Sequence, residues 1–228
     1  EIYTRNKIPV FTEDEEARFL FNEILGYWIS KYPNFAIVSN SFHLIDCFIG
    51  ADNLKTIFND SHLKETSLKS ICILDGDHSP EDQRGIISLP GEKAPEQLIF
   101  EHCEHLYNTD DSSFWENQDI INNGFSKELY LLKIRPQLQS IETEIQKRKD
   151  NHESTSGLRR RLNKKIFNQH IEFFRMITRN WLDKPENQKS LQYFYNGLRS
   201  LFYRVTPTNG IDRKIWDFDY NKIIKEDK

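Results

Sequence analysis

The stretch SICILDGD (Ser70–Asp77) decides the fold. It is a nearly unbroken apolar run that stops abruptly at two aspartates, Asp75 and Asp77. Such a run is typical of a strand buried on both faces, as in a parallel sheet with helices on each side. The sequence therefore predicts an α/β fold with two carboxylates at the carboxyl end of one strand, where open α/β sheets place their sites.

The rest of the first half alternates between strand and helix patterns. A short apolar run precedes a helical stripe that reaches Trp28, and the capping-box spacing of Thr12 and Glu15 predicts that this helix begins near Thr12. The further elements expected here are strands at Ile8–Thr12, Phe35–Asn40 and Gly85–Gly91 and helices at Leu44–Phe58 and Pro95–Tyr107.

The second half shows almost no strand pattern. Apolar residues at helical spacing predict helices over Phe125–Asn151, Lys164–Leu182 and Glu186–Tyr203. We therefore expect an α/β domain over residues 1–110 and a helical extension over residues 111–228.

Composition excludes several classes of protein. With 37% apolar and 13% aromatic residues the chain is too aromatic for a disordered protein, and no apolar run approaches the roughly 20 residues that span a bilayer. Three cysteines without paired spacing give neither a disulfide framework nor a zinc ribbon. We expect a cytoplasmic protein without membrane contact. Because the chain begins with Glu1, it is also consistent with a piece of a longer protein.

Charge is distributed unevenly along the chain. Residues 1–110 carry 9 Lys and Arg against 19 Asp and Glu, whereas residues 111–228 carry 22 against 16. Such asymmetry indicates nucleic-acid contact, although a solvated helical surface is an equally ordinary explanation. The densest basic run supplies the candidate DNA-binding residues Arg159, Arg160, Arg161, Lys164 and Lys165.

Acids also crowd the end of the first expected strand. TEDEEA (Thr12–Ala17) places four acids in one helical turn, more than capping or the helix dipole requires. If the first and third strands are neighbours, Glu13 faces Asp75 and Asp77 across one edge of the sheet. Carboxylates that close repel one another, and a bound divalent cation removes the cost. The alternative for the Asp-Gly-Asp stretch is a plain turn.

This layout resembles the TOPRIM domain, a Rossmann-like, mainly parallel fold. More specifically it is similar to the OLD-family endonucleases of ATPase-linked anti-phage systems, including retron-associated ones. The resemblance covers roughly residues 8–105 and lies in the acid after the first strand, the segment FHLIDCFIGADNLKTIF (Phe42–Phe58), ILDGDH (Ile73–His78) and SLPGEKAPEQLIFE (Ser88–Glu101).

The resemblance implies divalent-metal-dependent DNA cleavage with two Mg²⁺ or Mn²⁺ ions. Glu13, Asp75 and Asp77 match the family's acids, Glu16 and Glu96 are candidates for further metal ligands, and Lys164 is the candidate catalytic lysine. The implied partners are DNA, an ATPase domain or subunit outside this chain, a retron reverse transcriptase with its DNA, and a second copy of the chain.

Two other functions stay open. The family's common Glu-Gly is Glu13-Asp14 in this chain, which allows a catalytically inactive TOPRIM-like module that serves assembly or sensing. A phospho-receiver switch also places acids above a parallel sheet, but it needs a lysine at the end of its last strand, and the best lysines here open a helix instead.

Overall fold

A computed structural model describes residues 6–224. The chain forms two compact units. Unit 1 comprises Glu1–Pro95 together with Leu182–Lys228, and unit 2 comprises Glu96–Trp181. The expected division into 1–110 and 111–228 differs from this grouping, because the last helices of the chain return to the α/β unit.

Unit 1 is built on a four-stranded, all-parallel sheet with the strand order β2-β1-β3-β4. The strands are β1 (Ile8–Thr12), β2 (Phe42–Ile45), β3 (Ile71–Leu74) and β4 (Ile86–Ser88). All residues of β1 and β3 are buried, which explains their continuous apolar sequences. The predicted α/β class with a parallel sheet is confirmed, and β1 and β3 are hydrogen-bonded neighbours.

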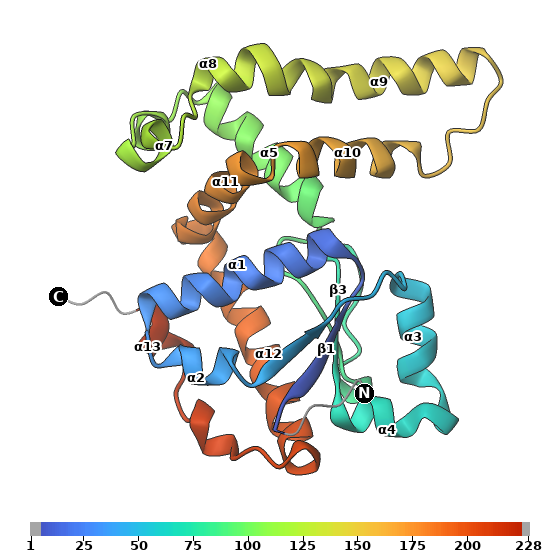
Figure 1. Ribbon diagram of the computed structural model, residues 1–228, viewed down its shortest axis with the longest axis vertical. Helices are drawn as coiled ribbons and strands as arrows, with labels where there is room; N and C mark the ends of the chain where they lie inside the picture. The colour runs from blue at the N-terminus through green and yellow to red at the C-terminus, as the bar shows by residue number, and fades with distance from the viewer. Residues whose placement is uncertain (1–5, 225–228) are drawn as a thin grey trace. The chain divides into compact units, whose positions relative to one another are not determined.

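Helices cover both faces of this sheet (Figure 1). On one face Leu54 and Phe58 pack against Phe11, Cys72 and Ile86. On the other face lies the longest helix of the chain, α12. The helices of unit 1 are α1 (Glu15–Lys31), α2 (Phe35–Ser39), α3 (Ala51–Asn59), α4 (Lys64–Lys69), α12 (Gln188–Asn209) and α13 (Tyr220–Ile224), with short 3₁₀ helices at Ser61–Leu63, Asp82–Arg84, Pro185–Asn187 and Arg213–Trp216.

An aromatic cluster joins the two ends of the chain within unit 1. Trp28 of α1 lies 5.3 Å, centroid to centroid, from both Phe35 and Tyr195. The ring of Trp216 completes the cluster, and its Nε1 donates a 2.6 Å hydrogen bond to Tyr195 Oη. All four side chains are fully buried. This burial of aromatic surface holds the C-terminal segment on the α/β unit.

The strand expected at Phe35–Asn40 was wrong, and the helix expected over Leu44–Phe58 is confirmed only from Ala51 onward. Phe35–Asn40 is not a strand; Phe35–Ser39 forms α2, because Phe35 and Val38 at helical spacing both face the core. The second strand is instead β2, at the start of the segment expected to be helical from Leu44, and the helix α3 begins only at Ala51.

The first helix also begins differently from the prediction. Thr12 ends β1, and Asp14 is the N-cap of α1, where its Oδ1 accepts a 3.0 Å hydrogen bond from the backbone N–H of Ala17. The expected capping box of Thr12 and Glu15 is therefore wrong.

Unit 2 is entirely helical within the described residues. Its core contains Phe167, Phe173 and Phe174 together with Tyr130. The helix expected over Lys164–Leu182 starts earlier and is broken at His170. The helices are α5 (Pro95–Asn108), α6 (Ser112–Trp115), α7 (Gln118–Asn122), α8 (Lys127–Leu129), a π-helix (Tyr130–Ile134), α9 (Arg135–Asp150), α10 (Leu158–Gln169) and α11 (Ile171–Asp183), of which α5 and α11 continue into unit 1 by one and two residues.

A charged network ties α5 to the π-helix and α9. Glu104 accepts hydrogen bonds from Arg135 Nη2 at 2.7 Å and from Tyr130 Oη at 2.6 Å. Burial acts to raise the pKa of Glu104, but these hydrogen bonds outweigh it and hold that pKa below its ordinary value. Among the described helices of both units, none is long and apolar enough to cross a membrane.

Candidate metal centre

Two predicted acids meet at the carboxyl edge of the sheet. Glu13 follows β1 and Asp75 follows β3, and the parallel pairing of these strands brings their ends together. The backbone N–H of Glu13 donates to Ile73 O at 3.3 Å. The backbone N–H of Asp75 lies 3.5 Å from Glu13 Oε2. Both side chains are only 2% exposed.

Asp14 completes a group of three carboxylates. One oxygen from each of Glu13, Asp14 and Asp75 lies within 4.8 Å of the others. Asp14 enters this group because it is the N-cap of α1, so its side chain turns back over the end of β1. The three acids come from two neighbouring strand ends and share one location at the sheet edge.

This donor set could hold a metal ion, because carboxylate oxygens suit small, hard divalent cations. These ions prefer carboxylate oxygens at about 2.1 Å, so oxygens bound to one octahedral ion lie about 3–4 Å apart. The three oxygens lie within 4.8 Å of one another, so small movements of the side chains would bring them to that arrangement. Three carboxylates this close also repel one another, and a bound cation would relieve that repulsion.

Gly76 shapes the loop between the two predicted aspartates. A Cβ atom at Gly76 would lie 2.9 Å from Lys93 O and 3.0 Å from both Glu92 N and Leu89 O, all of them backbone atoms. The backbone N–H of Gly76 also donates to Lys93 O at 3.1 Å. Only glycine permits this close approach, which fixes the course of the chain directly after Asp75.

Asp77 lies outside the three-carboxylate group. Its side chain is 56% exposed. His78 Nε2 lies 3.2 Å from Glu13 Oε2 and 3.8 Å from Asp77 Oδ1, so one nitrogen atom approaches both carboxylates. Asp77 therefore lies on the solvent side of the same site, and His78 links it to Glu13.

The other predicted site residues lie outside the group of three carboxylates. Glu16 is buried at 3% exposure in the first turn of α1, outside the group of three. Glu96 is 2% exposed in the first turn of α5 and belongs to unit 2. Lys164 lies half-buried on α10, also in unit 2. Among the described residues, Glu13, Asp14 and Asp75 are thus the acids that the structure gathers.

The predicted DNA-binding residues all lie on α10. This helix carries five Lys and Arg residues and no Asp or Glu. Arg159 forms a two-pronged ion pair with Glu142 of α9. Arg160, Arg161 and Lys165 are exposed. Four of the five predicted cations, Arg159 among them, are thus exposed at the surface of unit 2.

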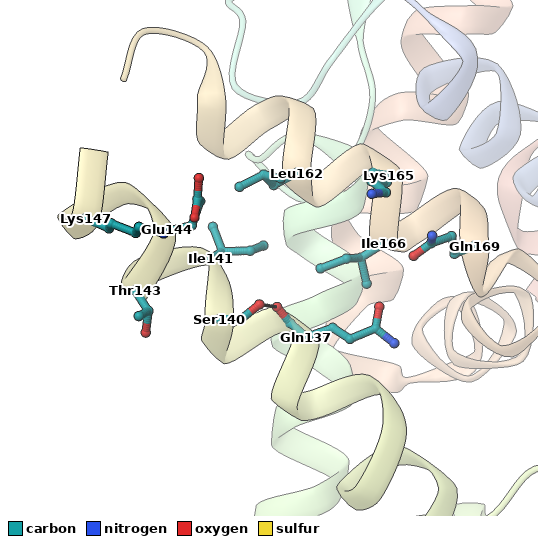
Figure 2. A pocket seen from close by; sticks show the side chains of 10 residues that line it. All are labelled: Gln137, Ser140, Ile141, Thr143, Glu144, Lys147, Leu162, Lys165, Ile166 and Gln169. Carbon is teal, nitrogen blue, oxygen red and sulfur yellow. Dashed lines mark hydrogen bonds between the residues drawn. The ribbon is translucent and has the colours of Figure 1, made fainter. Parts of the chain in front are cut away.

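A groove of about 590 Å³ runs between α9 and α10 (Figure 2). Ile141, Leu162 and Ile166 form its apolar floor, and Lys147 and Lys165 lie along its sides. Lys147 of α9 and Lys165 of α10 lie well apart along the groove in Figure 2, and Glu144 lines it as well, so the groove carries both positive and negative side chains.

Sequence reasoning missed Asp14. The position of Asp14 at the junction of strand and helix could have identified it. An Asp directly before the first helical residue is a strong N-cap, and this helix begins at the carboxyl edge of the sheet. Comparisons of the chain with protein-family models, with curated proteins and with solved structures gave no match, so the geometry of this site is the basis for the proposal that follows.

Proposed function

We propose that this chain is the nuclease part of a TOPRIM-type, OLD-like protein and hydrolyses phosphodiester bonds in DNA with the help of Mg²⁺ or Mn²⁺. The observation that carries the proposal is the group of three carboxylates, two of them buried, at the carboxyl edge of a parallel sheet. A group of this kind is costly to bury without a cation, and divalent-metal nucleases use such groups.

Each residue has a role in this proposal. Glu13, Asp14 and Asp75 would hold one ion, since their oxygens already lie within 4.8 Å of one another. Asp77, on the solvent side, would hold a second ion or orient the substrate. When bound, such ions supply an activated water and stabilise the leaving oxygen.

The basic helix α10 would bind the DNA backbone. Its exposed cations suit phosphates and carry no sequence information, so the binding is expected to be non-specific. Reversing the charge of Arg161 and Lys165 together should weaken DNA binding and reduce the slope of log K against log salt by about 0.9 for each phosphate that the protein no longer neutralises. The same reversal at Lys69 of α4, in unit 1, is the control.

The wider context of the proposal follows from the family resemblance. We expect an ATPase domain or subunit outside this chain, a retron reverse transcriptase with its DNA as a further partner, a homo-oligomer, and a role in anti-phage defence. The test is co-purification of these components with the chain from its native host.

A plasmid-nicking assay tests the activity. Supercoiled DNA is incubated with the chain in Mg²⁺, Mn²⁺ or EDTA, and wild type is compared with Glu13→Gln and Asp75→Asn. Glu65→Gln is the matched control, since Glu65 is an exposed acid of α4, which leads to the opposite end of β3. Metal-dependent nicking that disappears only in the two site variants is expected. Nicking in EDTA, or by both site variants at the wild-type rate, would refute the proposal.

One observation favours the inactive-module alternative. Asp14 stands where the family's common Glu-Gly has glycine, and its Oδ1 accepts the hydrogen bond that caps α1. If the chain binds Mn²⁺ in calorimetry but does not nick DNA with its partners present, the site serves assembly or sensing.

A further inference from the structure

A second cavity lies within unit 1, between α12 and the edge strand β4. Its volume is about 330 Å³. Tyr193, Asn196 and Gly197 contribute from α12, and Pro80, Ile87 and Ser88 contribute from the sheet side. Neither these residues nor the other two that line the cavity carry a charge.

The cavity is close to the carboxyl edge of the sheet. At the start of α12, Ser190 Oγ accepts from the backbone N–H of Gly91, just after β4; at its end, Asn209 Nδ2 donates to Lys69 O, just before β3. The helix therefore runs antiparallel to the strands. Tyr193, in its second turn, lies toward the edge that carries the acids.

Hydrogen bonds connect the cavity to the metal centre. Ser88 Oγ, on the cavity wall, donates a 2.7 Å hydrogen bond to His78 O. The ring of the same histidine lies 3.2 Å from Glu13 Oε2. One residue thus separates the wall of the cavity from the carboxylate group.

The lining suits a flat, uncharged ring. Tyr193 is 70% exposed, although its neighbours Phe194 and Tyr195 on α12 are buried. Ile87 forms an apolar floor, and Gly197 leaves the space of one methyl group above it, since a Cβ there would lie 3.6 Å from Ile87 Cγ2, in ordinary van der Waals contact. Asn196 supplies an amide that can pair with the edge of a ring.

We propose that this cavity binds one unstacked nucleobase of a single-stranded or frayed nucleic acid, with Tyr193 as the stacking platform; this rests on the proposed nuclease function. Its volume is at the small end of the roughly 300–1,000 Å³ typical of ligand pockets, which suits a base rather than a duplex. The lining offers no charged side chain to pair with a phosphate, which favours an uncharged occupant. The base would be held beside the acids that act on its backbone.

Fluorescence anisotropy with a labelled single-stranded oligodeoxynucleotide tests this inference. The measurement is made in EDTA, so that neither metal binding nor cleavage enters the result. Because base–aromatic stacking typically contributes about 1–3 kcal/mol, Tyr193→Ala should weaken binding by roughly 5- to 140-fold, whereas Tyr193→Trp should retain it. An oligonucleotide with abasic sites should bind wild type as weakly as the intact strand binds Tyr193→Ala.

Ile37→Ala is the matched control, because Ile37 is a 58% exposed apolar side chain on α2, away from the cavity. Wild-type affinity of Tyr193→Ala, or equal binding of abasic and intact strands, would overturn the inference. If the protein does not nick plasmid DNA but its affinity for the oligonucleotide still depends on Tyr193, the proposed nuclease function is wrong and the nucleobase site is supported.

Discussion

The stability of Asp75→Asn should show whether the three carboxylates form a metal-binding site or an acidic cluster with a structural role. In the absence of metal, the wild-type carboxylates repel one another; at an effective dielectric constant of 20, two charges 4.8 Å apart repel by about 3–4 kcal/mol. Replacing one carboxylate by an amide removes this repulsion, and the loss of hydrogen bonds made by the charge, about 1–3 kcal/mol, offsets it. We therefore expect Asp75→Asn to be at least as stable as wild type in EDTA.

Metal should reverse that order. A ligand at 100 times its dissociation constant stabilises the folded protein by about 2.7 kcal/mol, which corresponds to a rise in Tm of about 5–10 °C for a chain of this size. Wild type and Glu65→Gln should show this rise with Mn²⁺ in differential scanning fluorimetry, and Asp75→Asn should lose most of it. An equal rise in all three proteins, or a strong loss of stability of Asp75→Asn in EDTA, would show that the reasoning is wrong.

Three further predictions concern the loop, the core and unit 2. Gly76→Ala should cost about 1–3 kcal/mol of unfolding free energy in urea titrations, because the new Cβ meets backbone atoms, and should also weaken Mn²⁺ binding; a neutral effect on both would contradict the close approach. Trp28→Ala should cost about 3–5 kcal/mol, since the indole is fully buried, and a cost below about 1 kcal/mol would be inconsistent with that burial. Because the pKa of Glu104 is held below its ordinary value, its contribution to stability is present at neutral pH and lost as the pH falls through the folded-state pKa. Glu104→Gln should therefore be less stable than wild type in urea titrations at neutral pH, and the difference in unfolding free energy should shrink in acid. A difference that grows in acid would show that the pKa of Glu104 is not lowered by folding.

Strong local patterns predicted the centre of the sheet well. β1 and β3 are apolar throughout and buried on both faces, so their sequences carry a clear signal, and their adjacency put Glu13 beside Asp75 as expected. The Asp-Gly-Asp stretch does form a turn, as the plainer interpretation held, and the same turn brings one aspartate to the carboxylate group.

The errors lie where long-range packing decides the structure. Phe35–Ser39 has the composition of a strand, but burial of Phe35 against Trp28, Tyr195 and Trp216 favours a helix. The partners of Phe35 come from distant parts of the sequence, so no local pattern could reveal them. The break at His170 has no glycine or proline to mark it.

The return of α12 to the sheet makes unit 1 discontinuous in sequence, with unit 2 inserted between Pro95 and Leu182. During synthesis the ribosome completes residues 96–181 before α12 exists, so unit 2 has all of its sequence while one face of the sheet still lacks its covering helix. We therefore expect vectorial folding in which the inserted unit matures first and the carboxylate site is assembled late. A chain that ends before α12 would carry every acid of the site and still lack the helix that covers one face of the sheet.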